Sequence, residues 1–229
     1  MEILHATGIT GASSARGIAV VIDVLRSFTV SAYALAGGAR ECRLVTTTNE
    51  ARALAAATPD TVICAEEEGL PVKGIAISNS PTQIVAAELA GCILVQRSSA
   101  GTPVAAAVRE GVDIFAASLV VARATAQACL SRRPAVLTLV ASADHPEDHA
   151  CALYMEAIIR GVTPDIDRLL GPLKQSERYA HLADGAWPGF PATDLELALE
   201  PDRFGFAMPV TREAGYLSLT RADQADTNG

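Results

Sequence analysis

The chain has 229 residues, of which 50% are hydrophobic and 19% charged, so one large domain or two small ones can each bury a substantial core. The formal net charge of -8, without a visible basic stripe, excludes a general nucleic-acid-binding protein. The N-terminus lacks the pattern of a signal peptide, and no apolar run approaches the roughly 20 residues that span a bilayer. The five cysteines form neither a CxxC pair nor a zinc pattern. We therefore expect a reduced, cytoplasmic protein that binds neither nucleic acid nor a membrane.

Apolar strands alternate with alanine-rich helices from Gly17 to about Arg160. The predicted strands are Ile18–Val24, Cys42–Thr46, Val62–Ala65, Cys92–Gln96, Ile114–Ala117 and Val136–Val140. The predicted helices are Ser27–Ala36, Asn49–Ala57, Pro81–Ala90, Pro103–Arg109, Val120–Leu130 and Glu147–Ile159. This alternation predicts an α/β fold, with a mostly parallel sheet and helices on both of its faces.

Proline and glycine punctuate the chain after Gly161, and the regular alternation ends there. The elements predicted in this part are a short helix, Asp194–Leu199, and two strands, Phe204–Val210 and Tyr216–Thr220, in a hairpin; residues 222–229 are expected to fray. We predict a main α/β domain over residues 1–160 and a small, irregular C-terminal extension over residues 161–229. We expect the extension to pack on the main domain as an appendage; the alternative is that it completes an edge of the sheet.

The segment Gly17–Thr29 runs from an apolar strand into a turn that carries Asp23, Arg26 and Ser27. In open α/β sheets, ligands bind outside the carboxyl ends of the strands. An acid and a guanidinium at such an edge predict a site for a metal and a phosphate-type anion. The alternative is that Asp23 and Arg26 pair with each other and cap the next helix.

Three adjacent carboxylates, Glu66, Glu67 and Glu68, follow the third predicted strand. Such carboxylates repel one another unless they are solvated or share a cation. Glu66 is nearest the strand and is the metal candidate, whereas we interpret Glu67 and Glu68 as part of a solvated loop.

The segment Ile77–Thr82 precedes a predicted helix. Pro81 suits the first helical position and makes Ser80 the N-cap residue. The free N–H groups of this helix start and the small polar residues beside it are consistent with an anion site, or with plain capping by Ser80.

The segment Gln96–Pro103 gives the strongest local signal for an anion site. Small residues let the backbone approach an anion, and Arg97 supplies a fork of donors. The hydroxyl groups come from Ser98, Ser99 and Thr102. The segment lacks the GxxxxGK[ST] pattern, so it does not predict a nucleotide-binding loop of that type.

Acidic residues follow the last predicted strand of the main domain, in the segment Asp144–His149. Asp144 and Glu147 match a capping box, which gives Glu147 and Asp148 a structural explanation. Their place after a strand nevertheless makes a metal role worth considering, and we expect His149 to be a surface residue. The sequence contains no GxSxG, HExxH or GxGxxG pattern. Anion binding beside acids favours metal-assisted phosphoryl chemistry.

The motifs DVLRSFT, CAEEEG…ISNSP, RSSAGT, ASL and PEDHACA occur in this order and resemble the 2-phosphosulfolactate phosphatase family. The resemblance extends from Gly17 to about Arg160, with a weaker echo at 202–204. It implies a three-layer α/β/α fold and a Mg²⁺-dependent phosphatase. The substrate that it implies is 2-phospho-3-sulfolactate, in a step toward coenzyme M.

The residues and the resemblance together give the candidate site. The candidates are Asp23, Arg26, Ser27 and Arg97 as catalytic residues, Asn79, Ser80, Ser98, Ser99, Gly101, Thr102 and Ser118 as substrate-binding residues, and some of Asp23, Glu66 and Asp148 as Mg²⁺ ligands. Arg26 and Arg97 are expected to hold the phosphate or a second acidic group. The general base is not assigned.

The chain departs from the family pattern in its presumed substrate loops. Arg97–Ala100 stands where the family usually has TTN, Val121 or a neighbour replaces an asparagine, and Ala141–His145 replaces a glycine-rich approach. Two alternatives therefore stay open: a phosphatase of the same family with a different small phosphate as substrate, and a non-catalytic protein that binds a small anion. A homodimer is one open assembly state.

Overall fold

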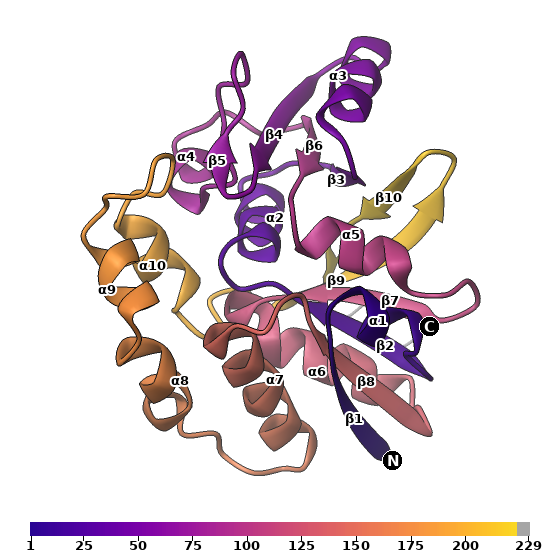
Figure 1. The fold of residues 1–229 in the computed structure, drawn as a ribbon. Helices are drawn as coiled ribbons and strands as arrows, with labels where there is room; N and C mark the ends of the chain where they lie inside the picture. The colour runs from indigo at the N-terminus through magenta and orange to yellow at the C-terminus, as the bar shows by residue number, and fades with distance from the viewer. Residues whose placement is uncertain (224–229) are drawn as a thin grey trace.

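The computed structural model describes residues 1–223, and within that range the strands form one mixed sheet of 11 strands (Figure 1). The order along the sheet is β1-β8-β2-β7-β9-β10-β3-β6-β4-β5, and β11 pairs with β9. The strands are β1 (Glu2–Thr7), β2 (Ile18–Ile22), β3 (Glu41–Val45), β4 (Thr61–Glu67), β5 (Leu70–Pro71), β6 (Ile93–Arg97), β7 (Asp113–Ala117), β8 (Val136–Ala141), β9 (Phe206–Glu213), β10 (Tyr216–Leu219) and β11 (Ala222–Asp223).

Helices connect most of the strands. They are α1 (Gly8–Ser13), α2 (Ser27–Ala36), α3 (Thr48–Ala57), α4 (Pro81–Val85), α5 (Gly101–Ala107), the 3₁₀ helix η1 (Leu119–Val121), α6 (Ala122–Ser131), α7 (Pro146–Ile159), α8 (Ile166–Lys174), α9 (Glu177–Ala183) and α10 (Thr193–Ala198). Among the described residues, none of these helices combines the length and the apolar character needed to cross a bilayer.

The sheet consists of two parallel blocks with an antiparallel hairpin between them. Strands β1, β8, β2 and β7 are parallel to one another, and so are β3, β6 and β4. Strands β9 and β10 are antiparallel to each other, and they pair with β7 and β3 respectively. The expected α/β fold is confirmed, with a mixed sheet.

The expectation that the C-terminal extension is a surface appendage is wrong for β9 and β10. Both strands lie inside the sheet, because their apolar side chains belong to the main core; Met208 and Leu219, for example, are fully buried there. The division into domains at residue 160 stays a prediction. Ala222 and Asp223, expected to fray, form β11, and the rest of that segment, residues 224–229, lies outside the described residues.

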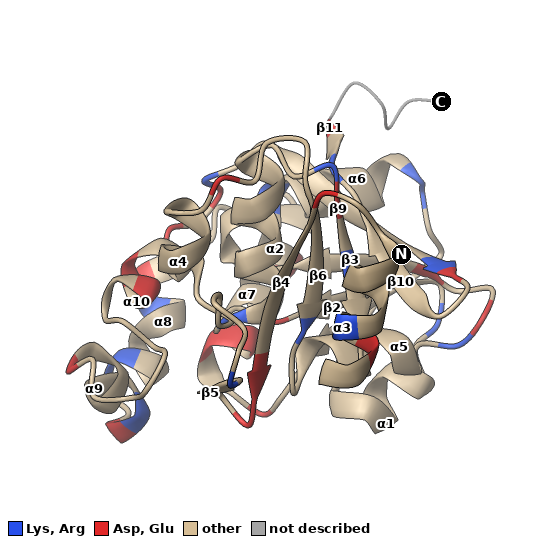
Figure 2. Ribbon diagram, turned by 90° about the horizontal axis from the view of Figure 1, so that it is seen from above, with Lys and Arg blue, Asp and Glu red and all other residues tan. Residues whose placement is uncertain are grey.

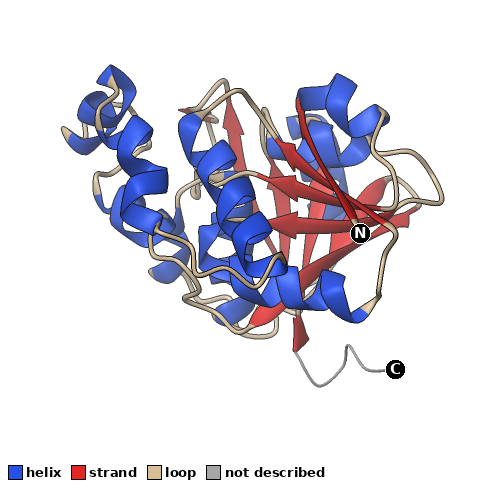
Figure 3. Ribbon diagram, turned by 90° about the horizontal axis from the view of Figure 1, so that it is seen from below, coloured by secondary structure: helices blue, strands red, loops and turns tan. Residues whose placement is uncertain are grey.

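Helices cover both faces of the sheet, which gives three layers, as Figure 3 shows. Side chains from α1, α2, α4 and α5 enclose the larger core on one face, and α6, α7 and α8 enclose a second core on the other. Strand β2 contributes to both cores, since Ala19 and Val21 point into the first and Val20 and Ile22 into the second. Its apolar run therefore reflects burial on both faces.

The sequence predicted the elements of the main domain well. All six strands expected between residues 17 and 160 are present, and α2 has the expected bounds. The helix expected over Pro81–Ala90 ends at Val85. Elements β1, α1, β5, α8 and α9 were not predicted. Helix α8 was missed because Gly171 and Pro172, which usually break a helix, lie inside it.

Candidate active site

A cavity of about 620 Å³ lies where the ends of both parallel blocks approach the C-terminal segment. The two blocks run in opposite senses, so a flat sheet would place their carboxyl ends at opposite edges. Sheets twist, and Figure 1 shows the β3–β6–β4 block turned strongly relative to β2, β7 and β8. The cavity is lined by Asp23, Leu25, Arg26, Glu66, Glu68, Gly69, Asn79, Ser98, Ser99, Ala100, His145, Glu177, Arg178, His181, Leu182, Trp187 and Phe190.

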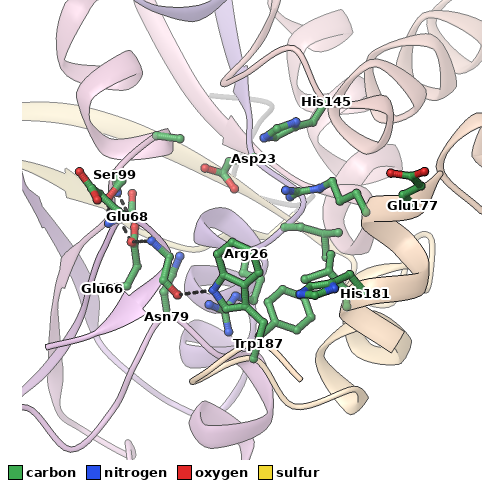
Figure 4. A pocket seen from close by; sticks show the side chains of 17 residues that line it. Asp23, Arg26, Glu66, Glu68, Asn79, Ser99, His145, Glu177, His181 and Trp187 are labelled. Atoms are coloured by element: carbon green, nitrogen blue, oxygen red, sulfur yellow. Dashed lines mark hydrogen bonds between the residues drawn. The ribbon is translucent and has the colours of Figure 1, made fainter. Parts of the chain in front are cut away.

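Figure 4 shows Asp23 between two groups of side chains. Glu66 lies on one side of it, and His145, Glu177 and His181 lie on the other. The first group comes from the predicted strand ends. The second comes from the start of α7 and from α9, which the sequence did not predict as parts of the site.

Asp23 directly follows β2 and is 3% exposed. Its Oδ1 accepts a hydrogen bond from the backbone N–H of Ser27 at 2.9 Å, so it also holds the start of α2. The pKa of Asp23 is raised to about 6, chiefly by burial and also by the charges of Glu66 and Glu147, while hydrogen bonds from Ser27 and Ser142 oppose the rise. This carboxyl group therefore keeps its proton to a higher pH than an ordinary aspartate does.

Arg26 is buried, and residues of the C-terminal segment hold it. Its Nη1 donates to Oδ2 of Asp194 at 2.8 Å and to the carbonyl oxygen of Gly189 at 2.6 Å. Its guanidinium carbon lies 4.2 Å from the ring centroid of Phe190. The ion pair with Asp194 replaces the pairing with Asp23 that the sequence left open, and it leaves other N–H groups of the guanidinium for a ligand.

Asp194 also binds the start of α4. Its Oδ1 accepts hydrogen bonds from Ser80 Oγ at 2.8 Å and from the backbone N–H of Thr82 at 3.0 Å. Ser80 is the N-cap residue and accepts from the backbone N–H of Gln83, as expected. A carboxylate of the protein thus occupies the helix start that we considered as an anion site. Ser80 lies behind the cavity wall, and substrate binding by it stays a prediction.

Glu66 lies near the end of β4, where Figure 2 shows a group of acidic residues. Its Oε1 accepts from the backbone N–H of Ser99 at 2.5 Å, and its Oε2 accepts from Gly69 N at 2.5 Å and Ser99 Oγ at 3.0 Å. Glu67 is exposed. Glu68 is also exposed, but it lines the cavity. Glu66 is therefore a fixed carboxylate in the cavity wall.

Arg97 directs its guanidinium toward the backbone. Its Nη1 donates to the carbonyl oxygen of Glu66 and to Ser99 Oγ, and its Nε donates to the carbonyl oxygen of Thr46 at 3.4 Å. Arg97 is not among the described residues that line the cavity. These contacts fix the end of β4, and a catalytic role for Arg97 stays a prediction.

A buried polar network lies beneath the cavity floor. Ser27 Oγ donates to Ser98 Oγ at 3.0 Å, and Ser98 Oγ donates to Thr102 Oγ1 at 3.1 Å. Gln96 Nε2 donates to Asn79 Oδ1 at 3.2 Å and to the carbonyl oxygen of Ser27 at 2.8 Å. Ser98 and Asn79 line the cavity, whereas Ser27 and Thr102 support them from behind.

Two further candidates for substrate binding, Gly101 and Ser118, also lie behind the wall. A Cβ atom on Gly101 would come within 2.7 Å of Asp23 Oδ2 and 3.0 Å of Ser27 Oγ, so a larger residue would force these side chains or α5 to move. Ser118 follows β7 and is fully buried, and its hydroxyl has no hydrogen-bond partner among the described residues. Direct contact of either residue with a substrate stays a prediction.

Asp148 holds the turn that follows Asp23. Its Oδ1 accepts from the backbone N–H of Val24 at 2.8 Å, and its Oδ2 accepts from Ser142 Oγ at 3.0 Å. Burial raises its pKa well above the ordinary range, and the charge of Asp23 adds to the rise. Asp148 is not among the described cavity-lining residues, so in this structure it positions the turn that carries Asp23.

The capping box expected at the start of α7 is not formed, so that interpretation is wrong. The N-cap residue is His145, without a side-chain cap. Asp144 instead contacts His149 at 2.8 Å. Glu147 is 1% exposed, and its Oε1 accepts from Arg178 Nη2 at 3.0 Å, because α9 packs against this end of α7.

The outer wall of the cavity comes from residues that the sequence interpretation missed. Arg178, His181 and Leu182 lie on α9 at spacings of three and four residues, which places them on one face of the helix. Trp187 follows the helix, and its Nε1 donates to the carbonyl oxygen of Gly69 at 3.2 Å. The spacing on α9 was the available signal, but the surrounding prolines and glycines obscured the helix.

The donor set of the cavity fits a hard cation such as Mg²⁺. Asp23 and Glu66 present carboxylates to the same cavity, and the charge of Glu66 contributes to the raised pKa of Asp23. Among the described residues, no group of three or more His, Cys, Asp or Glu side chains is arranged to hold a metal. Mg²⁺ commonly binds through one or two carboxylates and completes its shell with water and substrate phosphate. Asp23 and Glu66 are ligands of that type, and binding of Mg²⁺ by them stays a prediction.

Comparisons with known proteins agree with one another. A family model described as 2-phosphosulpholactate phosphatase matches residues 4–187. A probable 2-phosphosulfolactate phosphatase of Bacillus subtilis is 38% identical over 210 residues, which cover 89% of this chain and 91% of that protein. A protein of the same description from Deinococcus radiodurans is 35% identical over 115 residues, 50% of this chain and 48% of its own length. Another from Synechococcus sp. (strain RCC307) is 28% identical over 210 residues, 89% of this chain and 85% of its own length.

Proposed function

Because this chain belongs to the 2-phosphosulfolactate phosphatase family, we propose that it is a phosphoric monoester hydrolase that converts 2-phospho-3-sulfolactate to 3-sulfolactate and phosphate, with Mg²⁺ as its cofactor. One observation carries the proposal: Asp23 and Arg26, on one turn, line a cavity of about 620 Å³, which suits a small metabolite. A buried carboxyl group with a perturbed pKa in a cavity is typical of an active site.

Arg26 is the group that we propose for the phosphate. The contacts with Asp194 and Gly189 both use Nη1 and hold the guanidinium in one orientation. A guanidinium fixed in this way can offer its remaining donors to phosphate oxygens without rearrangement. Ser98 and Asn79 line the same cavity and offer further polar groups.

Asp23 and Glu66 are the residues that we propose for Mg²⁺, with Asp148 as the residue that positions the Asp23 turn. A bound Mg²⁺ would neutralise phosphate charge and favour ionisation of a water molecule. The backbone N–H of Ser27 orients Asp23, and Ser99 and Gly69 orient Glu66. The protein therefore holds both carboxylates in place before any ligand arrives.

A cytoplasmic location is part of the proposal. All five cysteines are free in the structure, and four of them are buried. Unpaired, buried cysteines are usual in proteins of a reducing compartment.

Release of inorganic phosphate tests the proposed function. The purified chain is incubated with 2-phospho-3-sulfolactate after EDTA treatment, and then with added Mg²⁺. We expect no turnover in EDTA and full turnover on addition of Mg²⁺. Arg26→Gln should lose turnover, whereas the matched control Arg168→Gln, which removes an exposed arginine on α8, should keep it.

The outcomes separate the alternatives. If another small phosphate ester is hydrolysed and 2-phospho-3-sulfolactate is not, the chain is a phosphatase with a different substrate. Binding of the phosphate without any turnover at saturating Mg²⁺ would indicate the anion-binding protein instead.

A further inference from the structure

The cavity has a second arginine, on the wall opposite the strand ends, that the proposed phosphate site does not use. Among the described residues that line the cavity, Arg26 and Arg178 are the arginines, and there is no lysine. Arg26 comes from the turn after β2, whereas Arg178 comes from α9. A ligand that touches both arginines therefore spans the cavity between two separate elements.

The guanidinium of Arg178 has N–H donors that are available to a ligand. Its Nη2 donates to Glu147 at 3.0 Å, and its buried Nε has no hydrogen-bond partner among the described residues. Its side chain is 36% exposed, so part of it faces the open cavity. A guanidinium has five N–H donors, and an unused buried donor costs free energy until an acceptor reaches it.

Glu147 holds Arg178 in the way that Asp194 holds Arg26. The Glu147 side chain is 1% exposed, and it contacts the guanidinium through one nitrogen only. This contact keeps the guanidinium at the cavity wall and leaves its other N–H groups available for a second acid. Both arginines of the cavity are thus anchored by buried carboxylates.

His145 lies beside Arg178 and lines the same wall. His145 is placed there because it is the N-cap residue of α7, two residues before Glu147, whose side chain accepts the hydrogen bond from Arg178. An imidazole can donate a hydrogen bond from a ring nitrogen. The wall therefore combines the guanidinium of Arg178 with a second hydrogen-bond donor, His145.

We propose that Arg178, with His145 beside it, binds the second acidic group of the substrate, a carboxylate or sulfonate, while the phosphate lies at Arg26. This proposal rests on the proposed phosphatase function, since it names the part of the substrate that the outer wall recognises. It assigns to Arg178 the role that the sequence offered to Arg97, whose guanidinium is engaged with backbone carbonyl groups. Arg178 is then a specificity-determining residue of the enzyme.

Paired substrates test the assignment. Values of kcat/KM are measured for 2-phospho-3-sulfolactate and for ethyl phosphate, which lacks both acidic groups, with Arg178→Gln and Arg178→Lys. We expect Arg178→Gln to lower kcat/KM about 10- to 100-fold on the acidic substrate, and less than about 2-fold on ethyl phosphate. Arg178→Lys should lie between, because lysine keeps the charge but loses the fork. Arg168→Gln is the control for loss of one positive charge from the same segment and should change neither value.

Equal losses on both substrates would place Arg178 on the phosphate or in the fold, and would overturn the assignment. An unchanged kcat/KM on both substrates would also overturn the assignment. The midpoint of urea unfolding of each variant shows whether folding is affected.

A binding measurement separates this proposal from the proposed function. Calorimetric titration with 3-sulfolactate, which has no phosphate, should show at least about 10-fold weaker binding to Arg178→Gln than to the unchanged protein, with inorganic phosphate bound equally by both. This result would support the acid site even if no phosphate ester were hydrolysed. Unchanged 3-sulfolactate binding would overturn it even in an active phosphatase.

Discussion

Arg26 and Asp194 form a buried ion pair of 2.8 Å between residues 168 positions apart in the chain. The Arg26 side chain is 4% exposed and that of Asp194 is 0% exposed. The same carboxylate binds Ser80 and the start of α4. One side chain of the C-terminal segment therefore fixes both the turn that carries Arg26 and a neighbouring helix.

Asp194→Asn should destabilise the protein by about 3–5 kcal/mol, because it leaves the buried charge of Arg26 without its partner. Urea unfolding measures the loss, and phosphate release measures the accompanying loss of turnover. Ser80→Ala is the control that leaves the ion pair intact: it removes one hydrogen bond to the same carboxylate and the N-cap bond to Gln83 N–H, and should cost about 2 kcal/mol. A similar small cost for both variants would mean that the ion pair contributes little.

Asp23→Asn should reduce turnover about 100-fold or more, because it removes a preorganised charge from the cavity while it keeps the shape of the side chain. The backbone N–H of Ser27 can still donate to the remaining oxygen. Phosphate release at saturating substrate measures the effect. Near-normal turnover would leave Asp23 with only the capping role that it has at α2.

The same variant should change how stability depends on pH. The pKa of Asp23 is raised from 3.8 to about 6, so the folded protein binds this proton more tightly than the unfolded chain. The resulting stabilisation is fully present below pH 3.8 and is lost as the pH rises through about 6.

In EDTA at pH 8, Asp23→Asn should therefore be more stable than the unchanged protein by about 3 kcal/mol. The difference should shrink as the pH falls toward 4. Urea unfolding at several pH values measures it, and a difference that stays constant with pH would contradict the raised pKa.

Gly101→Ala should impair turnover, because the added methyl group would lie 2.7 Å from Asp23 Oδ2 and force that carboxylate to move. A displacement of this kind typically costs about 10²-fold in rate. Gly205→Ala is the control, since nothing lies within 4 Å of a Cβ atom there. Equal activity of the two variants would mean that α5 shifts without disturbing Asp23.

Arg97→Lys should lower stability by about 1 kcal/mol, because lysine cannot keep all of the hydrogen bonds to the Glu66 and Thr46 backbone. Since Arg97 does not line the cavity, kcat/KM should fall by the same factor for acidic and simple phosphates. A loss of kcat/KM confined to the acidic substrate would indicate that Arg97 binds the second acidic group.

The sequence identified those residues of the site that lie at or directly after the ends of strands. Asp23, Glu66 and Ser98 each come directly after or at the end of a β-branched apolar run, and such runs are recognisable without a structure. Their meeting in one cavity depends on the twist between two blocks of opposite sense. No local pattern in the chain carries that information.

The residues that α9 and the loop after it contribute to the site could not be predicted in the same way. Residues of α9 and the loop after it reach the cavity only in the folded chain, in which α8 packs against α7 and α10 against α4. Asp194, for example, stands in a short helix after Pro191 with nothing nearby in sequence to indicate Arg26 as its partner. Long-range ion pairs depend on the assembled fold, and one sequence does not reveal them.

The position of β9 and β10 between the two parallel blocks has a consequence for how the chain is made. A ribosome synthesises residues 206–219 after every other strand of both blocks. Until they emerge, β7 and β3 have open edges, and such edges can pair with other chains. The complete sheet can therefore form only late in synthesis, and a chain that stops before residue 206 should aggregate and leave the cavity unassembled.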